Sequence, residues 1–198
     1  MPKVSRPSTL APLLPPGLAE RLLSAAMSRG GDFAEVYVER SAVTAVSLEE
    51  RAVKSAQVGL THGVGVRVVS GAKVGYAHSD DLDPAALLRT AQAAAHIARG
   101  GGAEQSFEVS RVPTPTHYRV AGPLSQVDVA KKAALVVRSD KAAHAFDARV
   151  EQVTATYADQ TKRIWVANTT GRFAEDTQDL CRLAVHVSPL PHPLVEIR

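Results

Sequence analysis

The stretch from His62 to His78 constrains the fold of this chain more than any other, because it predicts a β-hairpin at the centre of a sheet. Its valines alternate with other residues, which is the period of a half-buried strand. Residues 70–73 (Ser-Gly-Ala-Lys) then predict a type II′ turn, because glycine tolerates the positive φ that the first central residue of such a turn needs. In the resulting register Arg67 faces Tyr76, and the chain runs back to Ala77.

One face of this hairpin is apolar and has little bulk. It carries Val64, Val66 and Val68 beside Gly75 and Ala77. Small side chains let another element approach a sheet closely, so we expect a helix to pack on this face. The alanine-rich stretch that follows the hairpin is the candidate helix.

The opposite face mixes glycines with polar and aromatic side chains. Arg67 and His78 lie there, and we expect these two residues to face a substrate or a partner. Gly63 and Gly65 superficially resemble a nucleotide-binding loop, but no helix opens after them, as the dinucleotide fingerprint requires. Close approach of another backbone or side chain explains these glycines better.

Three helices are predicted from their start signals. Pro16 opens a short amphipathic helix that stops near Gly30. Asp83 can cap a helix whose first residue is Pro84 and which runs to about residue 99. The pattern of Ser125 followed by an acidic residue three positions on predicts a third helix that ends at about residue 139 or one turn beyond.

The remaining regular segments alternate with period two and predict strands. Besides the hairpin, they are residues 32–40, 43–49, 52–60, 149–158, 162–168 and 180–187, with turns at 49–51 and 159–161. Hairpin-connected strands with helices between them indicate an α+β fold. We therefore predict a mainly antiparallel sheet built from hairpins, with alanine- and leucine-rich helices packed on one face.

Four segments describe the expected domain organisation. Residues 1–15 form a disordered lead-in, residues 16–187 form the domain, and the proline-rich residues 188–198 form an irregular tail. The Gly- and Pro-rich residues 100–124 are either a linker or an extended crossing segment, and a sub-boundary of the domain falls there.

The composition indicates which classes of partner and which cellular compartment to expect. The formal net charge of +3 is small, and no run of Lys or Arg exceeds two residues, which argues against a nucleic-acid partner. No apolar stretch is long enough for a signal peptide or a membrane span. The single cysteine, Cys181, permits no internal disulfide, which fits the cytoplasm. We interpret Cys181 as a small buried hydrophobe rather than a nucleophile.

The sequence contains no complete catalytic set and no recognised metal motif. Its seven histidines are dispersed, and none forms a His-Glu-x-x-His pattern. His62 and His78 could meet at the hairpin mouth beside Asp80 or Asp81, but polar strand ends explain these residues better. We predict no catalytic residue, no metal ligand and no cofactor bound by this chain.

Several of these runs resemble the TldD/PmbA family, also called modulators of DNA gyrase. They are Gly-Asp-Phe-Ala-Glu-Val-Tyr-Val-Glu at residues 31–39, Gly-Val-Gly-Val-Arg-Val-Val-Ser-Gly at residues 63–71, and Val-Gly-Tyr-Ala at residues 74–77. The likeness is closer to the TldD branch than to the PmbA (TldE) branch. It extends over about residues 17–187, more loosely in the later part.

The resemblance implies the N-terminal domain of a cytosolic zinc metalloprotease. In the TldD branch a C-terminal domain carries a His-Glu-x-x-x-His zinc motif, and TldD pairs with a TldE-type subunit to enclose unfolded or peptide substrates. This chain has no such motif, so the catalytic domain is absent and zinc is expected only there. The chain is then a fragment, a truncated frame or a natural short form.

Three functions follow as hypotheses. The first is a non-catalytic N-terminal domain that contributes to substrate enclosure and to assembly with a TldE-type partner or with itself. The second is a stand-alone module whose sheet edge binds a peptide or a partner subunit. The third, modulation of gyrase or DNA binding, has only the family label and the mild positive charge in its favour.

Overall fold

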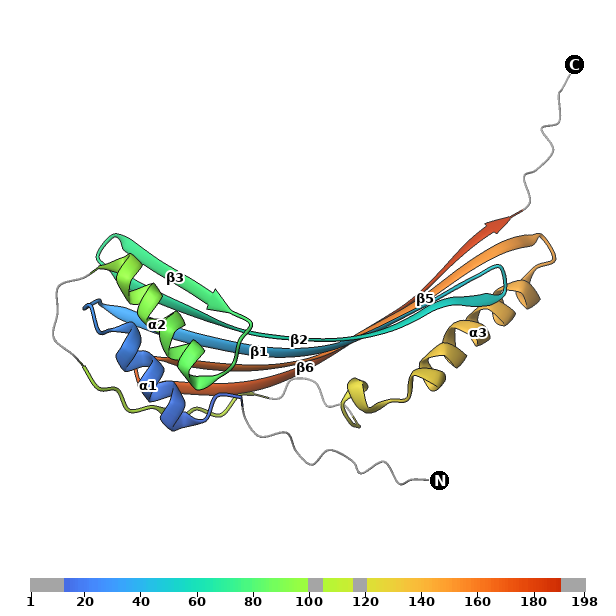
Figure 1. Cartoon of the computed structure of the whole chain (residues 1–198). Coiled ribbons are helices and arrows are strands. Elements are labelled where there is room, and N and C mark those ends of the chain that lie inside the picture. Colours follow the sequence, from blue (N-terminus) through green and yellow to red (C-terminus); the bar gives the residue numbers. More distant parts are fainter. Residues whose placement is uncertain (1–12, 100–104, 116–120, 190–198) are drawn as a thin grey trace, which may run out of the picture. The chain divides into compact units, whose positions relative to one another are not determined.

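The computed structural model describes residues 13–99, 105–115 and 121–189 (Figure 1). Most of the expected lead-in and tail, at residues 1–12 and 190–198, therefore lies outside the described residues. In chain order the described elements are α1 (Pro16–Ala26), β1 (Phe33–Glu49), β2 (Ala52–Ser70), β3 (Lys73–Ser79), α2 (Pro84–Ala98), β4 (Ser110–Arg111), the 3-10 helix η1 (Leu124–Gln126), α3 (Val129–Phe146), β5 (Val150–Asn168) and β6 (Arg172–Pro189).

The strands form one six-stranded sheet with the order β3-β2-β1-β5-β6-β4. Strands β2 and β3 pair antiparallel with Arg67 opposite Tyr76, which confirms the predicted register. Gly71 has a φ of +56° in the turn between them, as the predicted turn requires. The short β4 pairs parallel with the start of β6. The predicted α+β fold with a mainly antiparallel sheet is confirmed.

The chain divides into two compact units, and the long strands contribute residues to both. The first unit takes the chain up to Arg40 together with residues 62–115 and 163–176. The second takes residues 41–61, 116–162 and 177–198, of which 116–120 and 190–198 are not described. Each unit has its own buried apolar cluster.

Helices α1 and α2 cover one face of the sheet in the first unit (Figure 1). Pro16 opens α1, and the side chain of Asp83 accepts a hydrogen bond from the amide of Ala85 at 2.9 Å to cap α2, so both predicted helix starts are confirmed. The backbone of α2 lies directly over Gly75, as the lack of bulk on that hairpin face predicts. An ideal Cβ on this glycine would lie 2.1 Å from the carbonyl oxygen of Ala94.

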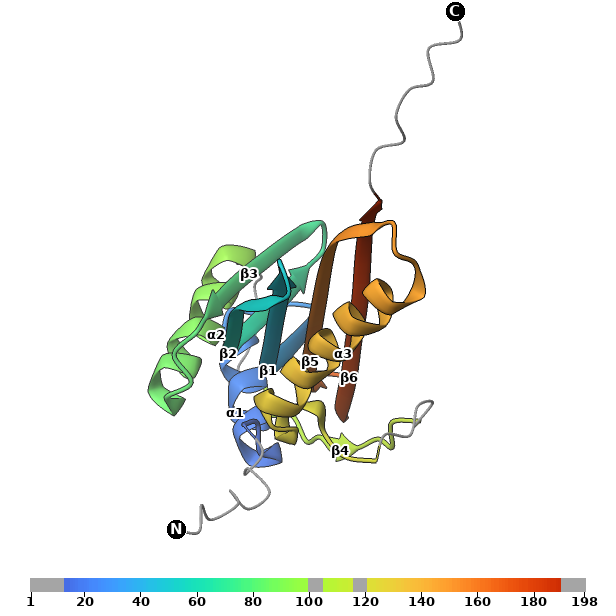
Figure 2. The same ribbon diagram turned by 90° about the vertical axis from the view of Figure 1, so that its right-hand side faces the viewer.

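Helix α3 covers one face of the sheet in the second unit (Figure 2). Its start differs from the prediction, because Asp128 rather than Ser125 is its N-cap and accepts from the amide of Ala130 at 2.8 Å. Ser125 instead belongs to η1, so the capping pattern marks the turn before the helix. The helix also continues to Phe146, past the predicted end at about residue 139 or one turn beyond.

The predicted breaks inside the strands are wrong. Residues 33–49, 52–70 and 150–168 are each one continuous strand. In β1 the alternating buried series Ala34, Val36 and Val38 is interrupted near Ser41 and resumes in the same phase at Thr44. This interruption looks like a strand end in the sequence although the backbone stays extended. In β5 the expected turn at 159–161 is strand, because Asp159 and Thr161 continue the buried face that begins at Val153.

Two further segments connect these elements. The turn between β1 and β2 places Glu50 and Arg51 at φ values of 49° and 60°, a region that side chains other than glycine rarely adopt. Residues 105–115 form the extended crossing segment, and the amide of Val109 donates to the carboxylate of Glu20 at 3.2 Å. Phe107 and Val109 pack against the core of the first unit.

Candidate functional site

Arg67, which we expected to face a substrate or partner, lies on the sheet face opposite α1 and α2. Its side chain is 49% exposed, and its guanidinium lies 3.4 Å from the carboxylate of Glu35. The guanidinium also stands over the ring of Phe33, 5.8 Å from its centroid. An exposed ion pair at this distance contributes little stability, so the cation remains accessible to another molecule.

His78 lies on the same face and is held by Tyr76. The two rings stack with centroids 6.0 Å apart and an interplanar angle of 27°. The Tyr76 side chain covers Gly65, where an ideal Cβ would lie 2.8 Å from the phenol oxygen. This confirms that a side chain closely approaches a hairpin glycine. The resulting surface combines aromatic rings with one cation.

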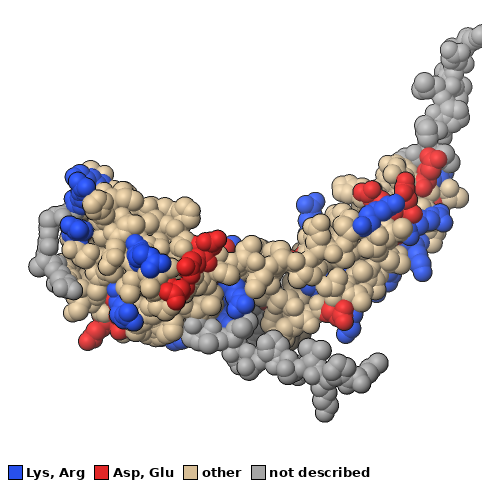
Figure 3. Space-filling view, viewed as in Figure 1, with Lys and Arg blue, Asp and Glu red and all other residues tan. Residues whose placement is uncertain are grey.

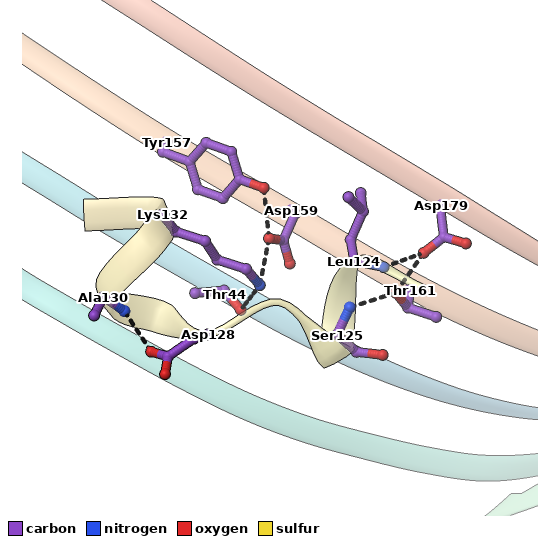
Figure 4. A network of polar contacts seen from close by, with 10 residues as sticks. All are labelled: Thr44, Leu124, Ser125, Asp128, Ala130, Lys132, Tyr157, Asp159, Thr161 and Asp179. Carbon is purple, nitrogen blue, oxygen red and sulfur yellow. Dashed lines mark hydrogen bonds and ion pairs between the residues drawn. The ribbon is translucent and has the colours of Figure 1, made fainter. Parts of the chain in front are cut away.

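A buried ion pair lies at the centre of the second unit (Figure 4). The ammonium of Lys132, on α3, lies 2.5 Å from the carboxylate of Asp159, on β5, and both side chains are almost fully buried. The same ammonium donates to the hydroxyl of Thr44 at 2.8 Å, and the phenol of Tyr157 donates to Asp159 at 2.7 Å. Burial, followed by the hydrogen bond to Asp159, raises the pKa of Tyr157.

A second group of hydrogen bonds holds η1 against β5 and β6 (Figure 4). The hydroxyl of Thr161 donates to the carboxylate of Asp179 at 2.5 Å. The same carboxylate oxygen accepts from the amide of Leu124 at 3.0 Å, and the amide of Ser125 donates to Thr161 at 3.1 Å. These contacts fix the position of the chain just before α3, and they therefore help to position the Lys132 side chain against the sheet.

The buried ion pair positions α3 and has no access to a substrate. Lys132 is 1% exposed and Asp159 is 5% exposed, so neither can reach a reacting group. Sequence reasoning missed this pair, because Asp159 was interpreted as a turn residue. The available signal was the period-two series Val153, Ala155 and Tyr157, which continues into Asp159.

The strand β6 exposes apolar side chains in the second unit. Leu180 is 63% exposed, and Leu183, Val185 and Val187 are between 41% and 48% exposed. Cys181 is exposed as well, so its interpretation as a buried hydrophobe is wrong. The reason is that β6 borders the sheet there, and α3 packs on β1 and β5 instead.

A shallow groove of about 410 Å³ adjoins this strand. Side chains of β1, β5 and β6 line it, among them Val43, Ala45, Ala158, Leu180 and Arg182. Its lining includes the small side chains of Ala45 and Ala158, and Arg182 supplies a positive charge. Such a surface can hold apolar side chains of an extended polypeptide next to an anionic group.

The residues present do not fit a catalytic zinc ion. A zinc site needs three or four converging His, Cys, Asp or Glu side chains, and within the described ranges no group of three such residues could hold a metal. The 198-residue sequence also lacks a His-Glu-x-x-x-His motif. None of the described helices is long and apolar enough to cross a membrane.

Two family models match the chain, one after the other. The model described as PmbA/TldA metallopeptidase domain 1 matches residues 34–98. The model described as the PmbA/TldA metallopeptidase central domain matches residues 122–188. Together they include all of the long strands in whole or in part.

Curated relatives carry the same family name. The chain is 31% identical over 161 residues to a metalloprotease TldD homolog from Haemophilus influenzae, which covers 80% of this chain and 33% of that protein. It is 25% identical over 156 residues to a metalloprotease TldD homolog from Buchnera aphidicola of Acyrthosiphon pisum, which covers 79% and 32%. The chain therefore spans about a third of the length of these curated relatives.

Solved structures share the fold at low identity. A Thermotoga maritima protein described as a modulator of a DNA gyrase matches with a TM-score of 0.65 and 18% identity, over 84% of this chain and 38% of that one. TldE from Thermococcus kodakarensis matches with a TM-score of 0.62 and 16% identity, over 88% and 40%. At such identities the likeness shows the fold alone.

Proposed function

The chain belongs to the PmbA/TldD metallopeptidase family, and from this premise we propose that it serves as the first and central domains of a TldD-type metalloprotease subunit. In this role it helps to enclose a peptide substrate and to assemble the subunit, and it does not hydrolyse peptides by itself. The observation that carries the proposal is the pair of consecutive domain matches in a sequence without a zinc motif.

Chemistry supports the non-catalytic part of this proposal. Zinc-dependent peptide hydrolysis needs histidine ligands on a helix and a glutamate that acts as base toward a metal-bound water. The buried Lys132–Asp159 pair and the exposed Arg67 supply neither. Zinc would therefore be held by residues that are not among these 198.

Assembly with a TldE-type partner, or with a second copy, is the second part of the proposal. The likeness to TldE supports it at the level of fold, and the exposed face around Arg67 and His78 offers a contact surface. We place this assembly in the cytoplasm, in keeping with a single free thiol. Figure 3 shows acidic and basic side chains on the visible face of each unit, so the visible faces are not the uniformly basic surface that nucleic acid requires.

The test uses the purified 198-residue chain. Its zinc content is measured by mass spectrometry after dialysis against zinc, and hydrolysis of an unfolded protein and of labelled peptides is followed by chromatography. We expect no stoichiometric zinc and no cleavage. Stoichiometric zinc together with peptide cleavage by this chain would overturn the proposal.

A second candidate function is a stand-alone module that binds an extended peptide or a partner strand. The exposed stretch Leu180–Val187 of β6 favours it, because an open strand edge is a template for pairing. Light scattering of the chain with and without peptides and a TldE-type partner tests it. A chain that stays monomeric and ignores both would contradict this function.

A further inference from the structure

We propose that the outer edge of β6 between Leu180 and Val187 binds an extended polypeptide as an added strand, and that this strand carries a carboxylate opposite Arg182. The inference deepens the peptide-binding function and rests on it. It adds the chemistry of the bound chain, which alternates apolar residues with at least one acidic residue.

The edge is open within the part of the chain that the structure describes. In the sheet order β6 lies outside β5, and its other neighbour, β4, pairs only with residues 172 and 173. The apolar cluster under α3 consists of residues from β1, β5 and α3, so this helix does not cover β6. A strand added along residues 180–187 would find backbone donors and acceptors that have no described strand partner.

The stretch lacks the devices that normally block an edge. Proline, lysine, inward-facing charges and bulges protect natural edges, and residues 180–187 (Leu-Cys-Arg-Leu-Ala-Val-His-Val) contain neither proline nor lysine. Leu183, Val185 and Val187 alternate along the strand, so they share one side and are each at least 41% exposed. An added strand with apolar side chains on that side would bury them.

The other side of the strand is positively charged. Arg182 is exposed there, and no ion pair joins its side chain to another described residue. His186 lies on the same side, four residues along. Directly opposed residues on paired strands come within contact distance, so opposite charges there stabilise pairing. Charge complementarity therefore calls for a carboxylate on the added strand.

The same charge disfavours a second copy as the occupant. A two-fold axis pairs β6 with itself antiparallel and keeps like sides together. When the axis passes through residue 182 or 183, Arg182 lies opposite its own copy or diagonal to it. Like charges in these positions are destabilising. An acidic strand from another polypeptide avoids this repulsion.

The test measures binding of fluorescent eight-residue peptides to the full chain by polarisation. One peptide alternates valine and threonine with a central glutamate, and matched peptides carry glutamine or lysine instead. We expect the glutamate peptide to bind about threefold to fivefold more tightly than the glutamine peptide, as an exposed ion pair allows. Methylation of alternate peptide nitrogens should abolish binding, because the added strand then lacks donors.

Charge reversal of the protein provides the decisive variant. Arg182→Glu should reverse the preference so that the lysine peptide binds best, whereas Arg138→Glu, on the exposed side of α3 in the same unit, should leave the preference unchanged. Binding that is sensitive to methylation but indifferent to Arg182→Glu would overturn the acidic strand and leave peptide binding standing. Absence of binding by every peptide, whether the chain is a monomer or a dimer by light scattering, would overturn the inference as well, and this outcome does not bear on the zinc and cleavage test.

Discussion

Replacing Gly75 by alanine should destabilise the first unit, because the backbone of α2 lies where the new methyl group would be. An ideal Cβ on Gly75 lies 2.1 Å from the carbonyl oxygen of Ala94 and 2.7 Å from the amide nitrogen of Ala98. Ordinary contact begins at 3.4 Å. Both obstructing atoms are backbone, so no side-chain rotation relieves the clash and α2 must move as a body.

The magnitude follows from that displacement. If α2 moves roughly 1 Å away from the sheet, its contacts with the sheet lose up to about half of their dispersion attraction. Overpacking in a dense core costs about 1–3 kcal/mol, and a clash with rigid backbone belongs at the upper end. Alanine regains about 0.5–1 kcal/mol, because glycine in a strand interior is itself unfavourable. We therefore expect a net loss of about 2 kcal/mol in the free energy of unfolding.

Urea unfolding followed by tryptophan fluorescence measures this loss. Trp165 is the only tryptophan of the chain, is 1% exposed, and belongs to the core of the first unit. The matched control is Gly63→Ala in the same hairpin, where the nearest atom, the carbonyl oxygen of Ser79, lies 3.4 Å from the ideal Cβ. A Gly75→Ala chain that unfolds at the same urea concentration as this control would refute the reasoning.

Three further perturbations probe the rest of the molecule. Lys132→Met should cost about 3–5 kcal/mol of unfolding free energy, because it leaves the carboxylate of Asp159 buried without its cation. The double variant that also carries Asp159→Leu should recover most of this loss. Urea unfolding followed by circular dichroism measures both variants. Arg51→Gly should raise the thermal midpoint, since it relieves a φ of 60° that costs about 1 kcal/mol, whereas a lowered midpoint would contradict that strain. Burial, together with the hydrogen bond to Glu39, raises the pKa of Tyr37 from 10.0 to about 12. The stability that Tyr37 contributes is therefore complete below pH 10 and is lost as the pH rises toward 12. Tyr37→Phe should remove one late step from the phenolate absorbance titration, and an unchanged titration would exclude this assignment.

Local chemistry explains why parts of the fold could be predicted. The register of the 62–78 hairpin follows from alternating valines and from one glycine that accepts positive φ. The starts of α1 and α2 follow from Pro16 and from Asp83 with Pro84. In each case residues within one turn of the chain supply the whole signal, so no knowledge of distant neighbours is needed.

The features that could not be predicted depend instead on residues that are distant in the sequence. Aspartate is a typical turn residue, so the sequence at Asp159 predicts a turn. Asp159 can be a buried strand residue because the ammonium of Lys132, from a helix earlier in the chain, pairs with its carboxylate. Ser41 lies at an interruption of the buried alternation in β1, and the sequence cannot distinguish this interruption from a strand end. The candidate residues Arg67 and His78 could be assigned to one sheet face from the hairpin register, whereas their contacts with Phe33 and Tyr76 required the folded structure.

The sequence by itself therefore determined the hairpin, the helix starts, the close approach of α2 to Gly75 and the α+β class, because each depends on periodicity, capping or the absence of a side chain. Only the tertiary structure decided which strands are continuous, which polar pair is buried and which strand borders the sheet. Those properties depend on which element covers which strand. Cys181 shows the difference plainly: its place in a strand could be predicted, but its exposure follows from the position of β6 in the strand order.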